Sequence, residues 1–286
     1  MTLTELYFLI LYFFTYAFLG WCTEVAFAAW KEHRFVNRGF LNGPICPVYG
    51  FGVASVIQFL TPFKSNLILL YLTSVIVVTF IEWLTGFVLE KVFHNKWWDY
   101  SNMPLNIQGY VCLPFSLIWG VACVFIVDCF HPVISGLLKY IPTVLGVILI
   151  CILIIAAFAD LWVTASGILK MNKRLEKMQE IAEELHQISD KLGETIYRNT
   201  ITAIEKQEEF KDNMAEKQAE FTAVLDEVSD ELKERIITLR QLYGETRGNT
   251  SHIQKRLLKA FPKMESRNHK EALEDLREKL KEKTRR

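Results

Sequence analysis

Charged residues are scarce in the first part of the sequence. Residues 1–170 hold only eight Lys or Arg and eight Asp or Glu, whereas residues 171–286 hold twenty-four of each. Long apolar runs with so few charges are typical of membrane-spanning helices, and the zero net charge of the whole chain hides this division. The composition therefore predicts a transmembrane domain, residues 1–170, followed by a charged water-soluble tail, residues 171–286.

Motifs that would indicate a metal or nucleotide site are absent. There is no Cys-x-x-Cys pair and no Cys/His ligand spacing, which argues against a zinc site. The six cysteines lie in or beside apolar segments, as expected of buried, unreactive thiols. A Gly-x-x-x-x-Gly-Lys-Ser/Thr loop is also missing, so the chain is not expected to bind ATP in that manner. The sequence predicts neither a metal ion nor a cofactor.

Five apolar segments are present that are close to the length of a membrane-spanning helix. Such a helix needs about 20 mostly apolar residues. The predicted spans are residues 3–30, 44–61, 66–90, 111–130 and 143–169. The second is the weakest, because it is short and contains Gly50 and Gly52. The first lacks the basic start of a cleaved signal peptide and is expected to be retained. The predicted fold class is all-α, a polytopic membrane protein.

Basic residues in the short loops predict the orientation, because cytoplasmic loops carry an excess of Lys and Arg. Nine basic residues flank the spans on one side, and these are Lys31, Arg34, Arg38, Lys91, Lys96, Lys170, Lys173, Arg174 and Lys177. Only Lys64 and Lys139 flank them on the other side. We therefore expect the N-terminus outside and the tail in the cytoplasm.

Residues 37–52, NRGFLNGPICPVYGFG, resemble a later stretch of the same domain. The matched pairs, aligned without gaps, are Gly39 with Gly109, Phe40 with Tyr110, Pro44 with Pro114, Tyr49 with Trp119 and Gly50 with Gly120. Upstream, the pattern glycine, aromatic, two residues, glutamate occurs at 20–24 and again at 86–90. This predicts a parallel internal repeat of two helix–loop–helix units followed by one more helix. Chance similarity between membrane segments of biased composition is the alternative.

The same stretch, with its glycines and prolines, interrupts the apolar sequence. Irregular backbone at membrane depth is tolerated only when it is buried in protein or lines a wet cavity. We expect either a broken-helix entrance to a polar site or, as the alternative, a tight loop between two ordinary spans.

Carboxylates inside the predicted spans are candidates for function. Glu24 and Glu82 lie in the cytoplasmic parts of the first and third spans. An ionisable side chain in lipid costs at least a few kcal/mol, so a functional interpretation has equal weight with a structural one. The structural alternative is an ion pair with a loop Arg or Lys, and for Glu90 we favour that alternative.

Residues 91–110 combine aromatic and polar side chains. The aromatic ones suit the membrane–water interface. The alternative, which we favour less, is a site for a polar or cationic small molecule or a lipid headgroup. The candidate substrate-binding residues from all these arguments are Glu24, Arg34, Asn37, Arg38, Asn42, Tyr49, Glu82, Glu90, Trp97, Trp98, Asp99, Tyr100, Asn106 and Tyr110.

The tail shows heptad spacing, which predicts a long helix or an antiparallel coiled-coil hairpin over residues 171–243 and homo-oligomers formed through it. The first predicted seam is Leu175, Met178, Ala182, Leu185, Ser189, Leu192 and Ile196. The second is Phe221, Leu225, Val228, Leu232, Ile236, Leu239 and Leu242. From Lys255 onward the chain is basic, and we expect a solvated helix or a contact with anionic lipid. Nucleic-acid binding is not expected, because acidic residues are interspersed.

Taken together, these motifs resemble the putative ABC-transporter type IV family of bacterial membrane proteins, whose members are labelled putative ABC transporter permeases. The resemblance covers residues 5–165. It is carried by Gly20-Trp21 with Glu24, RFVNRGFLNGPICPVYGFG (34–52), Glu82, Gly86, Glu90, WWDYS (97–101), Pro104, Asn106 and QGYVCLPFSLIWG (108–120). It implies a multi-pass protein of the plasma membrane that handles a transported substrate. It implies no catalytic residue, and any ATPase would be a separate subunit.

Three functions are therefore weighed. The first is a permease component of a transporter, with a polar site between the repeats on the cytoplasmic side of the midplane. The second is a membrane-anchored scaffold or sensor that acts through the cytosolic coiled coil. The third is a membrane enzyme acting on lipid, with carboxylates as general acid and base. We rank the enzyme last, because no nucleophile or metal motif supports it.

Overall fold

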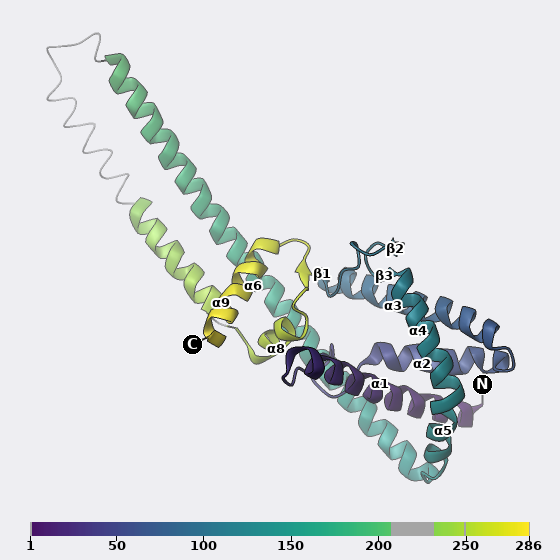
Figure 1. The fold of residues 1–286 in the computed structure, drawn as a ribbon. Helices are drawn as coiled ribbons and strands as arrows, with labels where there is room; N and C mark the ends of the chain where they lie inside the picture. The colour runs from purple at the N-terminus through teal and green to yellow at the C-terminus, as the bar shows by residue number, and fades with distance from the viewer. Residues whose placement is uncertain (1, 207–231, 249, 286) are drawn as a thin grey trace. The chain divides into compact units, whose positions relative to one another are not determined.

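The computed structural model describes residues 2–206, 232–248 and 250–285, which are mostly helical (Figure 1). The chain forms two compact units. The first consists of Met1–Met171 and Ser251–Lys270, and the second of Asn172–Thr250 and Glu271–Arg286. The predicted boundary at residue 170 therefore lies close to the first division, but a later part of the tail belongs to the first unit.

Apolar helices make up most of the first unit. They are α1 (Leu3–Glu32), α2 (Pro47–Leu60), α3 (Leu67–Phe93), α4 (Leu113–Phe125), α5 (His131–Lys139) and the first part of α6 (Thr143–Lys206). A 3-10 turn, η1 (Thr61–Phe63), follows α2, and a π-helical turn, η2 (Ile126–Phe130), joins α4 to α5.

Among the described residues, four helical stretches are long and apolar enough to cross a membrane, namely Leu3–Glu32, Leu67–Phe93, Leu113–Lys139 and Thr143–Lys191. The second predicted span corresponds to α2, which is apolar but only 14 residues long. Long apolar helices are thus confirmed for four of the predicted spans, and the number of spans stays a prediction.

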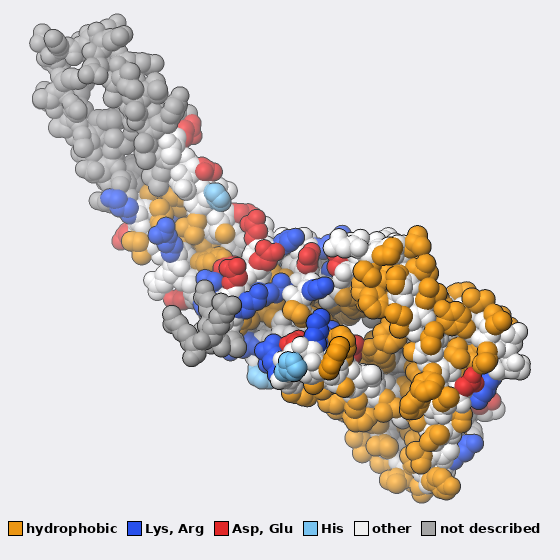
Figure 2. Space-filling model, viewed as in Figure 1, with side chains coloured by type: hydrophobic (Ala, Val, Ile, Leu, Met, Phe, Trp, Pro, Cys, Tyr) orange, Lys and Arg blue, Asp and Glu red, His pale blue; other side chains and the backbone are white. Residues whose placement is uncertain are grey.

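Hydrophobic side chains cover the outer surface of these helices. In Figure 2 the helices of the first unit are coated in orange, with few charged groups between. Phe80, Ile155 and Trp162 are each more than half exposed. Soluble proteins rarely expose apolar surface on this scale, so the surface fits a lipid environment. Cys129 and Cys151 are exposed on it too, so the prediction that all cysteines are buried is wrong for these two.

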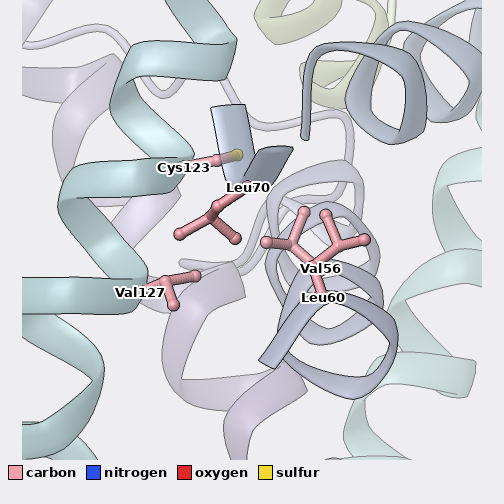
Figure 3. Packing of buried hydrophobic residues seen from close by; sticks show 5 residues of the cluster. All are labelled: Val56, Leu60, Leu70, Cys123 and Val127. Atoms are coloured by element: carbon pink, nitrogen blue, oxygen red, sulfur yellow. The ribbon is translucent and has the colours of Figure 1, made fainter. Parts of the chain in front are cut away.

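The helices of the first unit contact one another in a closed ring. Helix α1 contacts α2, α2 contacts α3, α3 contacts α4, and α5 returns to α1. Figure 3 shows the cluster in which α2, α3, α4 and η2 meet, formed by Val56, Leu60, Leu70, Cys123 and Val127. The return contact includes a hydrogen bond between the hydroxyls of Tyr12 and Ser135, at 2.9 Å.

The two helix–loop–helix parts of the ring begin and end alike. Helices α1 and α3 both end before a histidine in the left-handed conformation, His33 with φ 52° and His94 with φ 55°. Helices α2 and α4 both have a proline in the first turn, Pro47 as the first residue of α2 and Pro114 as the second residue of α4, where the missing backbone N–H costs little. These features agree with the predicted repeat, although Pro47 is not the residue aligned with Pro114, and the repeat stays a prediction.

In the second unit, α6 runs antiparallel to residues 232–248. Arg235 pairs with Glu184 at 2.6 Å, while Arg174 donates to the Thr246 carbonyl at 2.7 Å. Helix α9 (Lys270–Arg285) joins them through Asp275, which accepts a 2.8 Å hydrogen bond from the Tyr243 hydroxyl. The pairing agrees with the predicted hairpin, and the coiled coil itself stays a prediction.

The residues that face this pairing differ from the predicted seam. Ile181 and Ile188 are buried against Leu239, whereas Ala182 and Ser189 are exposed. The seam prediction is therefore wrong at Ala182 and Ser189. The predicted seam residues that lie outside the described side chains are Leu192, Ile196, Phe221, Leu225 and Val228.

Residues 251–270, here called the returning segment, belong to the first unit. They form α8 (His252–Ala260), which starts with a capping box at Ser251, and β4 (Glu265–Ser266). Strand β4 pairs antiparallel with β1 (Asn95–Lys96). A second short pair joins β2 (Asn106–Ile107) to β3 (Val111–Cys112). The helix expected from Lys255 onward includes α8, but Leu257 and Leu258 of α8 are buried, so this helix is solvated on one side only; the alternative contact with anionic lipid stays a prediction.

Candidate functional site

A polar cluster lies where α1, α2 and the first loop meet. The Tyr49 hydroxyl donates to the Glu24 carboxylate at 2.7 Å, and Arg38 pairs with the other Glu24 oxygen at 3.2 Å. Both charged side chains are only about a quarter exposed, at 26% for Glu24 and 28% for Arg38. The sequence predicted this ion pair as the structural alternative for Glu24, and Tyr49 as a neighbour of the site. The structure brings all three together.

Glu82 is the second carboxylate of this region. Its Oε2 atom is buried and has no hydrogen-bond partner among the described residues. Tyr100, in the loop after α3, lies near both Glu82 and the first cluster. Burial raises the pKa of Tyr100, and the negative charges of Glu82 and Glu24 raise this pKa further. One phenol therefore lies in the electrostatic field of both carboxylates. Of these two acids, Glu24 has a cationic partner, whereas the buried oxygen of Glu82 has no hydrogen-bond partner among the described residues.

Aromatic rings border the cluster on two helices. Tyr49 of α2 and Trp119 of α4 meet edge to face, with ring centroids 5.7 Å apart. These are two of the residues that the sequence alignment matched with each other. Glycines let tyrosine rings pack directly on the backbone of α1 and α3, because Gly20 contacts the ring of Tyr49 and Gly86 contacts the ring of Tyr110. A buried acid beside aromatic rings has the chemistry to hold a cationic or hydrogen-bond-donating group.

Other predicted site residues brace the first loop instead of facing the cluster. The Asn37 side chain accepts from Trp21 Nε1 at 2.8 Å and donates to the Asn42 carbonyl at 2.7 Å. Asp160 of α6 accepts from the backbone N–H of Asn42 at 3.0 Å and of Gly43 at 2.6 Å. The Asn42 amide also donates to Asp160, at 2.8 Å. The glycine-rich stretch is therefore a buried, hydrogen-bonded loop and not a free turn.

The third loop is braced in a similar way. Trp98 Nε1 donates to the Tyr110 carbonyl at 2.8 Å, and the Asn106 amide donates to the Met103 carbonyl at 2.9 Å. Asp99 accepts from Lys96 Nζ at 2.8 Å. Burial raises the pKa of Asp99, but hydrogen bonds from Lys96 and Ser101 outweigh burial and hold the pKa below its ordinary value. These polar groups already have partners within the loop.

The remaining predicted residues lie apart from the cluster. Glu90 is buried and pairs with Arg267 of the returning segment. Trp97 is buried edge to face against Phe40 and Phe261, with centroids 5.1 and 5.0 Å apart. Arg34 is exposed and pairs with Glu32 at 2.7 Å, two residues away. The structure thus brings five predicted residues into one region, and these are Glu24, Arg38, Tyr49, Glu82 and Tyr100.

Three contributors were missed at the sequence level. Trp119 was matched with Tyr49 in the repeat, so the alignment contained its signal. Asp160 is an acid within the last apolar segment, but nothing in the sequence linked it to Asn42. Arg256 donates to the carbonyls of the first loop, and no local pattern could have indicated a contact over that distance. Among the described residues, no group of three His, Cys, Asp or Glu is placed to hold a metal ion.

Comparisons with known proteins add one finding. A family model described as putative ABC-transporter type IV matches residues 11–165, which confirms the resemblance read from the motifs. Neither the curated proteins nor the solved structures gave a match.

Proposed function

Because the chain belongs to the putative ABC-transporter type IV family, we propose that it is the permease component of a membrane transporter. The family match and the four apolar helices are consistent with a membrane transporter component. The observation that carries the finer proposal is Glu82 of the apolar helix α3, whose carboxylate has a buried oxygen without a hydrogen-bond partner in the described chain. An acid kept in such a place is costly and is commonly part of a pathway.

The substrate site of the proposed permease is the polar cluster of Glu24, Arg38, Tyr49, Glu82 and Tyr100. One observation and one general rule support this location. Tyr49 and Trp119, equivalent positions of the proposed repeat, contact each other, as residues near the axis of a duplicated bundle would. Transporters built from repeats commonly bind substrate where the repeats meet. The polar loops that border the cluster are the cytoplasmic ones in the proposed orientation.

The energy source is proposed to be a separate ATPase subunit. The chain has no phosphate-binding loop of its own, and we propose that it carries out no catalytic step. The first and third cytoplasmic loops, residues 33–46 and 94–112, are the proposed docking region. Coupling would then pass through the two loops that contain Arg38 and Tyr100.

The test is affinity purification of the tagged full-length protein from native membranes, followed by mass spectrometry and an ATP hydrolysis assay. We expect an ATPase subunit in stoichiometric amount. We further expect Glu82→Gln to lower the hydrolysis rate of the complex by roughly tenfold or more, since its carboxylate is the uncompensated group of the site. Glu32→Gln is the matched control, because it removes an acid at the end of α1 that pairs with Arg34 and lies outside the polar cluster.

Equal hydrolysis rates for the Glu82→Gln, Glu32→Gln and unsubstituted complexes would show that Glu82 is not required for the proposed function. Equal yield of the variants in the membrane fraction establishes that both insert.

A scaffold or sensor is the second candidate function. The observation that favours it is the antiparallel helix pair of the second unit, which has its own apolar core of Ile181, Ile188 and Leu239. The same purification separates the two candidates. Recovery of soluble signalling or cell-envelope proteins, without an ATPase, would favour the sensor.

A further inference from the structure

The returning segment has an unusual place in the chain. Its residues, 251–270, lie in sequence between two parts of the second unit but pack in the first unit. Within that unit the segment is attached at several separate points. Gln254 donates to the Gly167 carbonyl at 3.4 Å, Arg267 pairs with Glu90, and β4 pairs with β1. It is therefore an integral part of the cytoplasmic end of the first unit.

Arg256 of α8 makes the contact closest to the polar cluster. Its Nη1 atom donates to the Gly39 carbonyl at 2.8 Å and its Nη2 atom to the Phe40 carbonyl at 2.9 Å. The planar guanidinium presents two donors in a fixed fork, which an ammonium group cannot reproduce. Burial lowers the pKa of Arg256 and the charge of Asp160 raises it, and a guanidinium remains protonated throughout the physiological range.

The two carbonyls that Arg256 holds belong to Gly39 and Phe40, the two residues that follow Arg38 in the chain. Arg38 itself reaches back to Glu24, so the backbone on either side of Gly39 is tied to two different parts of the protein. On the other side of the loop, Asp160 holds the N–H groups of Asn42 and Gly43. With its carbonyls held by Arg256 and its amides held by Asp160, the loop has little freedom to move Arg38.

We propose that Arg256 is a positioning residue for the candidate site, and that the returning segment sets through it whether Arg38 pairs with Glu24. The consequence of this positioning for transport rests on the proposed function, whereas the positioning of Arg38 by Arg256 does not depend on it. Loss of the Arg256 contacts frees the loop, separates Arg38 from Glu24 and leaves two acids, Glu24 and Glu82, without cationic partners.

Cys46 supplies a readout that does not depend on transport. It is the residue before α2, it is 6% exposed, and its N–H donates to the Ala17 carbonyl at 2.9 Å. Its thiol lies in the electrostatic field of Glu24, Arg38 and Arg256. We expect loosening of the first loop to expose the Cys46 thiol, and substitutions in α8 that do not touch this loop to leave the thiol covered.

The experiment uses the full-length protein in detergent, with Cys46 as the single cysteine and the other five replaced by serine or alanine. Alkylation of Cys46 by a maleimide is followed over time. We expect Arg256→Ala to raise the labelling rate by about tenfold, because two charge-assisted hydrogen bonds are lost. Arg256→Lys, which keeps the charge but not the fork, should fall between Arg256→Ala and the unsubstituted protein.

Lys255→Ala is the matched control, because it removes the same charge from an exposed neighbouring position on α8. Equal labelling rates for Arg256→Ala and Lys255→Ala would overturn the proposal. Should Arg256→Ala fail to fold, Arg256→Gln and Arg256→Lys give the same comparison. The double variant Arg256→Ala/Arg38→Ala tests whether Arg256 acts through Arg38. We expect the two increases in labelling rate to be less than additive, because both residues hold the same loop.

ATP hydrolysis by the purified complex separates this proposal from the proposed function. Faster labelling of Arg256→Ala supports the positioning role whatever the hydrolysis rate. Labelling that rises while hydrolysis stays unchanged would keep Arg256 as a positioning residue and remove the Glu24–Arg38 pair from the transport step.

Discussion

At the scale of single residues, Gly20 sets the position of the most connected side chain of the candidate site. A Cβ added to Gly20 would lie under 3.0 Å from three carbon atoms of Tyr49. Tyr49 also donates to Glu24 and contacts Trp119, so little room is left for its ring to move. The absence of a side chain at position 20 is therefore a condition for the geometry of the cluster.

We predict that Gly20→Ala displaces Tyr49 and lowers stability by about 1–3 kcal/mol, the usual cost of overpacking. Gly52→Ala is the control on the neighbouring helix, because a Cβ there meets nothing within 4 Å. The measurement is the thermal midpoint of the full-length protein in detergent. Equal midpoints for the two variants would mean that Tyr49 is not held as described.

Local sequence patterns identified the acids of the site but not all of their partners. Glu24 and Glu82 were recognisable because an acid within an apolar helix is conspicuous in any sequence. The choice between function and ion pairing could not be made from the sequence, because it depends on which loop side chains reach each acid. Arg38 reaches Glu24, whereas Glu90 pairs with Arg267, a residue in a distant part of the chain.

At the scale of elements, the second unit shows how a partner decides which face of a helix is buried. From Met178, a step of three leads to Ile181 and a step of four to Ala182, and both fit a helical repeat. The sequence prediction took the step of four. The antiparallel partner, which includes Leu239, packs on Ile181 and Ile188 instead.

We predict that Ile188→Ala lowers the stability of the second unit by about 2–4 kcal/mol, because it removes a buried side chain from a packed cluster. Ser189→Ala, at the adjacent exposed position, should change stability by less than about 0.5 kcal/mol. Urea or thermal unfolding followed by helical circular dichroism measures both. A larger loss for Ser189→Ala than for Ile188→Ala would restore the predicted seam.

At the scale of the whole molecule, the distribution of basic residues predicts one orientation in the membrane. Lys139, at the end of α5, is expected outside the cell, and Lys263, in the returning segment, inside. Both side chains are exposed, so a cysteine at either position is accessible from its own side. Their labelling therefore reports directly on topology.

In a protein otherwise free of cysteine, we predict that Lys139→Cys reacts with a membrane-impermeant maleimide on intact cells, because it faces the outer medium. Lys263→Cys should react only after permeabilisation. The opposite result would invert the orientation, and with it the assignment of the polar loops to the cytoplasm.

Periodicity and composition predicted the membrane helices and the helical tail, because both depend on patterns within a few turns of helix. They could not predict that residues 251–270 join the first unit. That contact links Arg256 with Gly39 and Phe40, and it depends on backbone carbonyls that carry no sequence signal. The predicted division into a membrane domain and a separate tail stays a prediction, and it did not include the packing of the returning segment in the first unit.

The position of the returning segment in the chain has a consequence for biogenesis. A ribosome completes the membrane helices and the first loop long before it reaches Arg256, since residues 172–250 must be translated in between. During that interval the newly inserted bundle holds Arg38 by its own contacts alone. On the proposed role of Arg256, the polar cluster would therefore reach its final geometry only late in synthesis, after the helices that contribute to it have been made.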